Sequence, residues 1–266
     1  MRCLAPALFV ITLVAAAACE EKPRAEATPA TAAAAPSVAP ALAPAPAPTP
    51  EKTAEAPKPK KKLEDCPKGP QVEFDSKEIE FEVRRKLPKP DGPVTQADLR
   101  RLRSLNLSQV KLAELDVCLF TPMKGLKELF LGPGDYSDLS PIAGATQLES
   151  LRASINQVSD LSPLEKLTKL DRLDLGRTQI RDLKPLAGLT KLTELQIDDT
   201  QVEDVTPLAG LTELETLSLK RTRVKDVSAL KDLKKLKFLY IGGSPLDEDV
   251  MSVAPVRANG TKIISD

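Results

Sequence analysis

The chain has 266 residues with 38 basic and 38 acidic side chains, so its formal net charge is zero. It contains no His and no Trp, and its other aromatic side chains are only 6 Phe and 2 Tyr. The absence of His excludes Ser-His-Asp and Cys-His catalysis and His-ligated zinc or haem. Neutral charge and few aromatic side chains argue against a nucleic-acid partner. No nucleophile–base pair or phosphate loop is visible either, so we expect neither an enzyme nor a metal, cofactor or small-molecule substrate.

Residues 1–18 have the pattern of an export signal. Their apolar run of 15 residues is shorter than a usual membrane span of about 20 residues. The run ends in Ala16-Ala17-Ala18-Cys19, which resembles a bacterial lipobox, although Ala16 stands where Leu is usual. The resemblance implies that Cys19 is lipidated and becomes the mature N-terminus. A signal that is cleaved without lipidation and a retained membrane helix are the alternatives.

Residues 19–65 are predicted to be an Ala- and Pro-rich linker. Within this linker, 20–62 hold 14 Ala and 10 Pro and almost no large apolar side chain. Such a segment cannot bury enough apolar surface to offset the entropy cost of ordering it, and Pro favours extended polyproline II. We expect a disordered, semi-rigid stalk that holds a folded domain away from a membrane.

Residues 102–246 contain a repeat of 22 residues. One unit starts at Leu126, and further units start at 148, 170, 192, 214 and 236. In the unit 170–191, apolar residues occupy positions 1, 4, 6, 11, 14, 17 and 20, and the next unit fills the same positions. The Leu-x-x-Leu-x-Leu signature at a fixed period identifies a leucine-rich repeat.

Individual repeat positions predict structural roles. Positions 4 and 6 alternate inward from a short strand, and the small polar residue at position 9 satisfies backbone groups where the chain leaves the sheet. Position 13 is Asp in five successive units, and we expect it to accept a backbone N–H at a short turn. A calcium site on this Asp column is the weaker alternative, because neighbouring oxygen ligands at the calcium-loop spacing are missing. The predicted fold is an α/β solenoid, a right-handed superhelix with a parallel concave β-sheet, short 3-10 or α turns on the convex side and a helical N-terminal cap.

The ends of the array need caps because no single repeat buries its own core. We expect the N-terminal cap in 66–101, with one helix in 76–86 and a second helix that begins near Thr95. An irregular first strand should follow at 105–107. The whole repeat array then runs to residue 246.

The C-terminal cap is predicted in 247–266. We expect a helix over 247–256, a turn at Asn259-Gly260 and a last short strand at 262–264.

The repeats also carry a family resemblance. The run GPVTQADLRRLRSLNL, followed by units that end in DLxPLAGLTKL, resembles internalin-type bacterial leucine-rich-repeat proteins. The resemblance covers about 75–266. It implies a rigid surface for protein–protein recognition rather than an enzyme.

Two cysteines remain after the signal and Cys19 are set aside. Cys66 enters the N-terminal cap and Cys118 lies in the first irregular repeat, so both belong to the same end of the solenoid. An even pair in an exported chain predicts a disulfide, and two unpaired buried thiols are the alternative.

The concave face of the sheet is the predicted binding surface. Positions 3, 5 and 7 of each unit point outward between the buried leucines. The candidate ligand-binding residues are Phe130, Arg152, Arg172, Asp174, Glu194, Asp198, Lys220, Phe238 and Tyr240. Exposed aromatics and Arg are enriched in binding hot spots, which favours ligand contact. The alternative is that these charges pair across neighbouring strands and only keep the sheet soluble.

These features together predict a binding protein of the bacterial cell envelope. We expect a monomer anchored only through its N-terminal lipid, at the outer membrane on its periplasmic side or at the cell surface. Its partner should be a protein held on the concave face. Binding of polysaccharide or peptidoglycan in the envelope and a non-lipidated, secreted binding protein are the alternatives.

Overall fold

A computed structural model describes residues 62–88, 91–247 and 251–265. These residues all belong to one compact unit, Pro57–Asp266. The expected export signal, the lipidation site Cys19 and the expected linker up to residue 61 lie outside the described residues.

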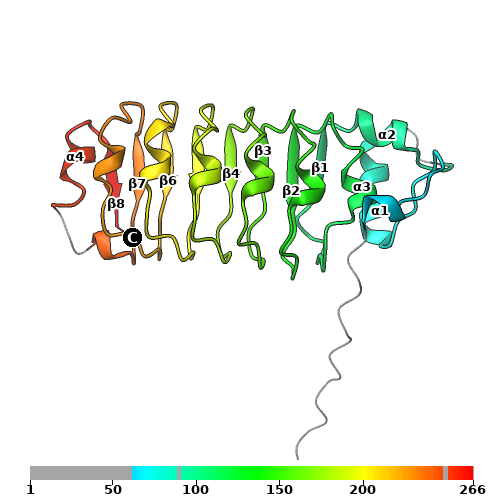
Figure 1. Cartoon of the computed structure of the whole chain (residues 1–266), viewed down its shortest axis with the longest axis horizontal. Helices are drawn as coiled ribbons and strands as arrows, with labels where there is room; N and C mark the ends of the chain where they lie inside the picture. Colours follow the sequence, from blue (N-terminus) through cyan, green and yellow to red (C-terminus); the bar gives the residue numbers. More distant parts are fainter. Residues whose placement is uncertain (1–61, 89–90, 248–250, 266) are drawn as a thin grey trace, which may run out of the picture. The chain divides into compact units, whose positions relative to one another are not determined.

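Eight short parallel strands form one sheet in sequence order (Figure 1). They are β1 (Ser104–Leu107), β2 (Glu128–Leu131), β3 (Ser150–Arg152), β4 (Arg172–Asp174), β5 (Glu194–Gln196), β6 (Thr216–Ser218), β7 (Phe238–Tyr240) and β8 (Lys262–Ile264). From β2 to β7 each residue pairs with the residue one repeat away, so Leu129 lies beside Leu151 and Leu151 beside Leu173. The 22-residue period therefore sets the register of the sheet.

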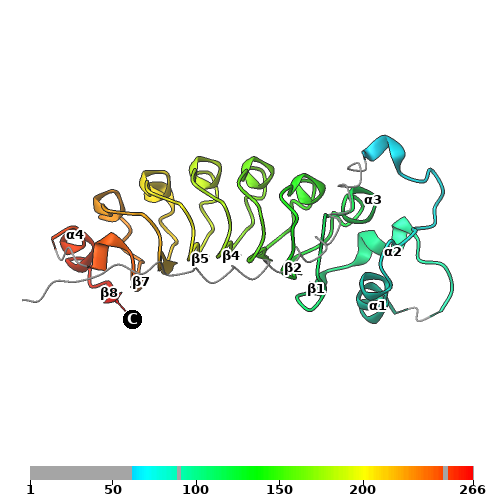
Figure 2. The ribbon, with the colours of Figure 1, turned by 90° about the horizontal axis from the view of Figure 1, so that it is seen from below.

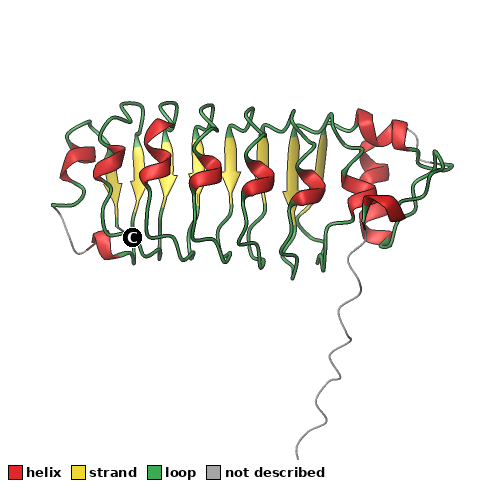
Figure 3. Ribbon diagram, in the orientation of Figure 1, coloured by secondary structure: helices red, strands yellow, loops and turns green. Residues whose placement is uncertain are grey.

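Short helical turns return the chain from each strand to the next. They are α3 (Val117–Phe120), η2 (Ser140–Ile142), η3 (Ser162–Leu164), η4 (Lys184–Leu186), η5 (Thr206–Gly210) and η6 (Ser228–Leu230), where η marks a 3-10 turn. Figures 2 and 3 show the strands along one side of the repeats and the helical turns along the other. In Figure 2 the repeats fan into a shallow arc with the strands on its inner side. The sheet and turns of a leucine-rich-repeat solenoid are thus present as expected.

The Asp at position 13 accepts a backbone N–H in every repeat that carries it. Asp160 Oδ1 accepts from Ser162 N at 2.9 Å, and Asp204 Oδ1 accepts from Thr206 N at 2.8 Å. The same bond recurs at Asp138, Asp182 and Asp226. Each carboxylate thus fixes the start of a 3-10 turn from one residue before its N-cap, as an Asx turn does.

The small polar residue at position 9 closes the loop that leaves each strand. Thr178 Oγ1 donates to Leu175 O at 2.8 Å, and Thr200 Oγ1 donates to Ile197 O at 2.7 Å. These side chains are buried, so their hydroxyls and the carbonyls they contact satisfy each other away from water.

Two helices cap the N-terminal end. In α1 (Lys77–Lys86) the N-cap Ser76 accepts from Ile79 N at 3.2 Å. In α2 (Gln96–Arg101) the N-cap Thr95 and Asp98 form a reciprocal capping box. Both helices begin where the sequence predicts, because Ser and Thr side chains satisfy the first free N–H groups of a helix.

The C-terminal cap differs from the expected long helix. A 3-10 turn, η7 (Pro245–Asp247), comes first, and α4 (Ala254–Arg257) is only four residues long. Pro255 lies in the first turn of α4, where its missing N–H costs nothing, and Gly260 with φ +89° follows the helix. The expected last strand is present as β8.

The core is a continuous column of apolar side chains between sheet and turns. Leucines at position 4 of the strands, such as Leu129 and Leu195, are fully buried. The position-11 residues behind them are also buried, and one of these is Tyr136 rather than Val or Ile. Stacking thus removes from water the apolar face that a single repeat would expose.

Candidate functional site

The open face of the sheet carries all nine candidate binding residues. They come from strands β2 to β7 and from the loops that follow β5 and β6. Arg152, Arg172 and Phe238 are exposed, whereas Phe130, Asp174, Glu194, Asp198, Lys220 and Tyr240 are half-buried. The alternation of buried Leu and outward side chains brings these residues together, as the strand period predicts.

One of the candidate carboxylates is paired across the sheet. Asp174 on β4 accepts from Arg152 Nε on β3 at 2.9 Å, and it also accepts from Gly176 N at 3.1 Å. This carboxylate therefore joins two neighbouring strands and holds the start of its own loop.

Asp198 is likewise committed to the sheet. Its Oδ1 accepts from Ser218 Oγ at 2.5 Å and from Lys220 N at 2.9 Å. Both donors belong to the next repeat, so Asp198 fixes the end of β6 against the loop of the repeat before it. For Asp174 the alternative of charge pairing across strands describes the contact that the structure has, whereas Asp198 accepts from a hydroxyl and a backbone N–H.

The rim beside the sheet contains a second charge cluster. Asp199 accepts from Arg221 Nη2 at 2.6 Å, and Arg177 Nε lies 3.4 Å from the same carboxylate. Hydrogen bonds from Arg221 hold the pKa of the Asp199 carboxyl below its ordinary value. Asp199 thus stays ionised at neutral pH between two guanidinium groups of the neighbouring repeats.

The C-terminal end of the face is aromatic and basic. Phe238 and Tyr240 lie on β7, and the Lys220 ammonium lies 5.1 Å from the centre of the Tyr240 ring. Across the next strand pair, Lys262 lies beside Phe238 and Ile264 beside Tyr240. An apolar centre bordered by cations is the chemistry of a protein-binding hot spot.

Ile155 is an exposed apolar side chain that sequence reasoning missed. It occupies position 8, is 47% exposed and has a φ of 61°. The same left-handed backbone recurs at Arg177, Asp199, Arg221 and Gly243. A signal was present in the sequence, because Ile155 is a large apolar residue where the other repeats have Pro, a charged residue or Gly.

The charge pairs carried a sequence signal as well. Arg152 and Asp174 are 22 residues apart, and the same separation joins Lys127 to Glu149 and Glu215 to Lys237, each at 2.6 Å. In an array with a fixed period, opposite charges one period apart lie on adjacent strands or loops. They can therefore be read from the sequence as pairs.

The chain is similar to known leucine-rich-repeat proteins in sequence and in structure. The family model of leucine-rich repeats (2 copies) matches residues 146–188. The structure of an internalin (inlF) from Listeria monocytogenes is 28% identical, with a TM-score of 0.59 over 65% of this chain and 53% of that one. Internalin C2 from the same organism is also 28% identical, with a TM-score of 0.56 over 68% of this chain and 89% of that one.

The chain is an internalin-like leucine-rich-repeat protein. It spans about half of the length of the first internalin. A leucine-rich-repeat protein of Leptospira interrogans is 19% identical, with a TM-score of 0.50 over 62% of this chain and 49% of that one, and shares the fold. A comparison with curated protein sequences gives no match.

The N-terminal cap of this internalin-like protein is covalently closed. Cys66 and Cys118 form a disulfide with their Cα atoms 5.3 Å apart, as the sequence led us to expect. The bond ties the segment before α1 to α3, the helix that follows the first strand.

Within the described ranges 62–88, 91–247 and 251–265, no helix is long and apolar enough to cross a membrane. Nor do three or more Cys, Asp or Glu side chains gather there in a way that could hold a metal ion. The buried polar side-chain atoms of this part of the internalin-like protein all have hydrogen-bond partners.

Proposed function

We propose that this protein binds a protein partner on the open face of its sheet and is held in the bacterial cell envelope by a lipid on Cys19. Internalin-like leucine-rich-repeat folds are typically interaction scaffolds rather than enzymes, which supports a binding role. A rigid, parallel sheet also presents its side chains with little entropy cost on binding.

The position of the exposed apolar side chains carries this proposal. Within the repeats 102–246, Ile155 and Phe238 are the large apolar side chains that are exposed, at 47% and 39%. Phe238 lies on the open face of the sheet, in strand β7. Ile155 lies on the rim, in the loop that follows strand β3. Phe238 stands beside Tyr240 on β7, and aromatic side chains of this kind are enriched in protein-binding hot spots.

Arg172 and Arg152 complete the surface between these two ends. Arg172 Nε lies 3.5 Å from the carboxylate of Asp171, and its side chain is 60% exposed. Arg152 is 54% exposed while it pairs with Asp174. Exposed arginines with loose or single partners can turn to a carboxylate of a bound protein, whereas Asp174 and Asp198 each already accept two hydrogen bonds within the sheet.

The binding surface is tested by a triple substitution. Arg152, Phe238 and Tyr240 are all changed to Ala in the full chain, and a matched triple changes the exposed Lys166, Lys184 and Lys231 to Ala on the side of the helical turns. We expect the first triple substitution to weaken binding of the envelope protein by about 2 kcal/mol or more, so that capture is lost. The second triple substitution should leave capture unchanged. Equal capture by both variants would exclude the open face as the binding surface.

The same two variants separate a protein partner from a cell-wall partner. Purified protein is sedimented with isolated cell wall. Co-sedimentation that depends on Phe238 and Tyr240, without a captured protein, would replace the proposed partner by a polysaccharide or peptidoglycan.

The lipid anchor is tested independently of binding. Metabolic labelling with a palmitate analogue should mark the wild-type chain, and Cys19→Ala should remove both the label and the membrane association. A chain that is released without label in both forms would be a secreted binding protein instead.

A further inference from the structure

The repeat 214–235 is the most basic of the array. It holds seven basic and three acidic residues, a net charge of +4, whereas the preceding repeat, 192–213, holds six acidic residues and no basic one. Four of the cations lie on one loop that begins at the open face and passes over the rim. They are Lys220, Arg221, Arg223 and Lys225.

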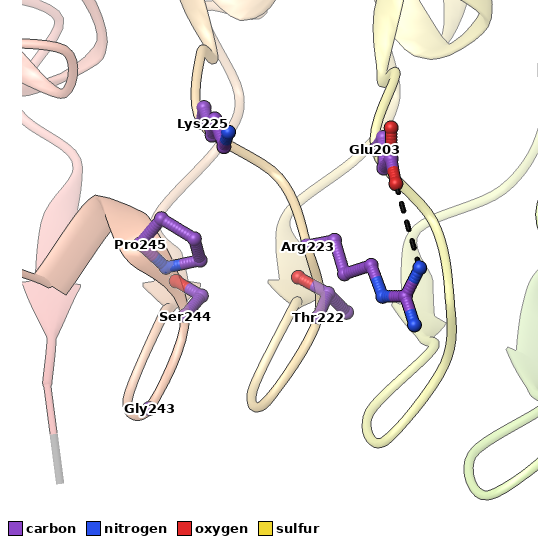
Figure 4. A pocket seen from close by; sticks show the side chains of 7 residues that line it. All are labelled: Glu203, Thr222, Arg223, Lys225, Gly243, Ser244 and Pro245. Atoms are coloured by element: carbon purple, nitrogen blue, oxygen red, sulfur yellow. Dashed lines mark ion pairs between the residues drawn. The ribbon is translucent and has the colours of Figure 1, made fainter.

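A hollow of about 570 Å³ lies beside this loop and is lined by seven residues (Figure 4). The hollow is open because the following repeat has Gly243 and Pro245 at positions where earlier repeats carry longer side chains. A Cβ atom at Gly243 would come within 3.0 Å of Arg221 Cγ, so a larger residue there would crowd the rim. The floor contains the buried Thr222 and Ser244, whose hydroxyls donate to Leu219 O and Ile241 O.

The two cations that line the hollow are weakly committed. Figure 4 shows Arg223 extended toward Glu203 of the preceding repeat, with Lys225 above Pro245 in this view. Arg223 Nη1 lies 3.7 Å from Glu203 Oε1, beyond hydrogen-bond length, and both side chains are more than 60% exposed. Among the described residues, Lys225 is exposed and has no ion-pair partner.

We infer that this hollow and the loop Lys220–Lys225 bind an acidic, extended segment of the protein partner whose apolar residues contact Phe238 and Tyr240. The inference rests on the proposed function and names the chemistry of the partner. The segment runs from the aromatic end of the open face over the rim, and its carboxylates pair with Arg223 and Lys225.

Carboxylates fit this site because its arginines already face them. Arg223 lies against the Glu203 carboxylate, and the neighbouring Arg221 holds the Asp199 carboxylate through Nε and Nη2. A carboxylate that enters the hollow exchanges for Glu203 at Arg223, so one exposed ion pair replaces another and little desolvation is added. The entering carboxylate of the partner also pairs with Lys225, and this ion pair is the one that binding adds.

The probe is a fluorescein-labelled peptide of alternating Glu and Leu, followed by fluorescence anisotropy with the full chain at low ionic strength. We expect binding that weakens as salt is added, and no binding of the matched Lys and Leu peptide. Arg223→Gln and Lys225→Gln should each weaken binding roughly two- to five-fold. Arg223→Glu combined with Lys225→Glu should weaken it more than roughly ten-fold, and Lys166→Glu combined with Lys184→Glu should not.

Three results would overturn the inference. The first is binding of the acidic peptide that is equal in the hollow variant and the control variant. The second is stronger binding of inorganic polyphosphate than of the peptide through the same two residues. The third is no peptide binding by a chain that still captures its partner through Arg152, Phe238 and Tyr240, which would leave the proposed function in place.

Discussion

Asn156 Nδ2 donates a hydrogen bond of 3.0 Å to the hydroxyl of Tyr136 inside the repeat core. Both residues depart from the repeat pattern, because Tyr136 replaces the Val or Ile of position 11 and Asn156 replaces the Thr or Ser of position 9. Asn156 still makes the loop contact of that position, through a bond of 2.6 Å to Ala153 O. Burial raises the pKa of Tyr136 to about 12, so its hydroxyl stays neutral and bonded. The two departures therefore compensate each other across a repeat boundary.

Tyr136→Phe should destabilise the protein by about 1–3 kcal/mol, because one N–H of Asn156 is left buried without a partner. Asn156→Thr restores the usual residue of position 9 and should cost less in the Tyr136→Phe background than in the wild type. Urea unfolding of the four proteins of this cycle measures the coupling free energy. A coupling near zero would contradict the assigned contact.

Ile155→Asn should stabilise the protein by about 1 kcal/mol. A β-branched residue at a φ of 61° is strained, and Asn tolerates the left-handed region better. Little apolar burial is lost, because Ile155 is 47% exposed. The control Gln157→Asn is also exposed but does not share the left-handed backbone, so it should change the unfolding free energy by less than about 0.5 kcal/mol. Loss of stability in Ile155→Asn would show that packing of the Ile155 side chain stabilises the protein by more than its left-handed backbone destabilises it.

The sequence was sufficient for the repeats and for the helices of the N-terminal cap, but not for the first repeat's helix or for the helix of the C-terminal cap. The 22-residue period predicts the sheet and its register because each unit must stack on an identical one. The length of α4 was not predicted, because the end of the array does not follow the repeat pattern. Pro255 lies in the first turn of α4, so the helix begins there and is short. The helix α3 was missed for the same reason, since it lies in the irregular first repeat.

The candidate site was predicted as a surface but not as a set of contacts. The period of two along each strand places Arg172 and Phe238 on the open face, since their neighbours are buried leucines. Whether a charged side chain already has a hydrogen-bond or ion-pair partner within the protein depends on side-chain rotamers and on the loop that follows the strand. For this reason the roles of Asp174 and Asp198 in holding loops became visible only in the structure.

Asp199 should make stability fall in acid. Because the pKa of its carboxyl is lowered by Arg221, the unfolded chain takes up a proton first as the pH falls. Its contribution is complete above about pH 4 and is lost as the pH falls through the folded-state pKa. Thermal unfolding from about pH 2 to about pH 7 should show a smaller acid loss in Asp199→Asn than in the wild type. In Arg221→Gln the folded-state pKa of Asp199 moves back toward its ordinary value, so the acid loss should also be smaller than in the wild type. An unchanged profile in both variants would refute this role of the ion pair.

Reduction of Cys66–Cys118 should open the N-terminal cap. The bond closes a loop with a sequence separation of 52 residues, and such bonds contribute about 2–4 kcal/mol in loop-entropy models. Hydrogen exchange is the suitable measurement, because repeat arrays unfold locally. Cys66→Ser with Cys118→Ser should speed exchange in α1 and β1 and leave β5 and β6 unchanged. Uniform protection in both proteins would show that packing alone holds the cap.

The central claim is that the open face of the sheet meets a protein partner in the cell envelope. The most direct measurement places a photo-reactive amino acid at Phe238 or at Lys184 in the full chain, followed by irradiation of living cells. The account predicts one cross-linked protein of defined mass from position 238, lost when Arg152 and Tyr240 are also changed to Ala, and none from position 184 in turn η4. The same adduct from both positions, or none from position 238, would contradict it.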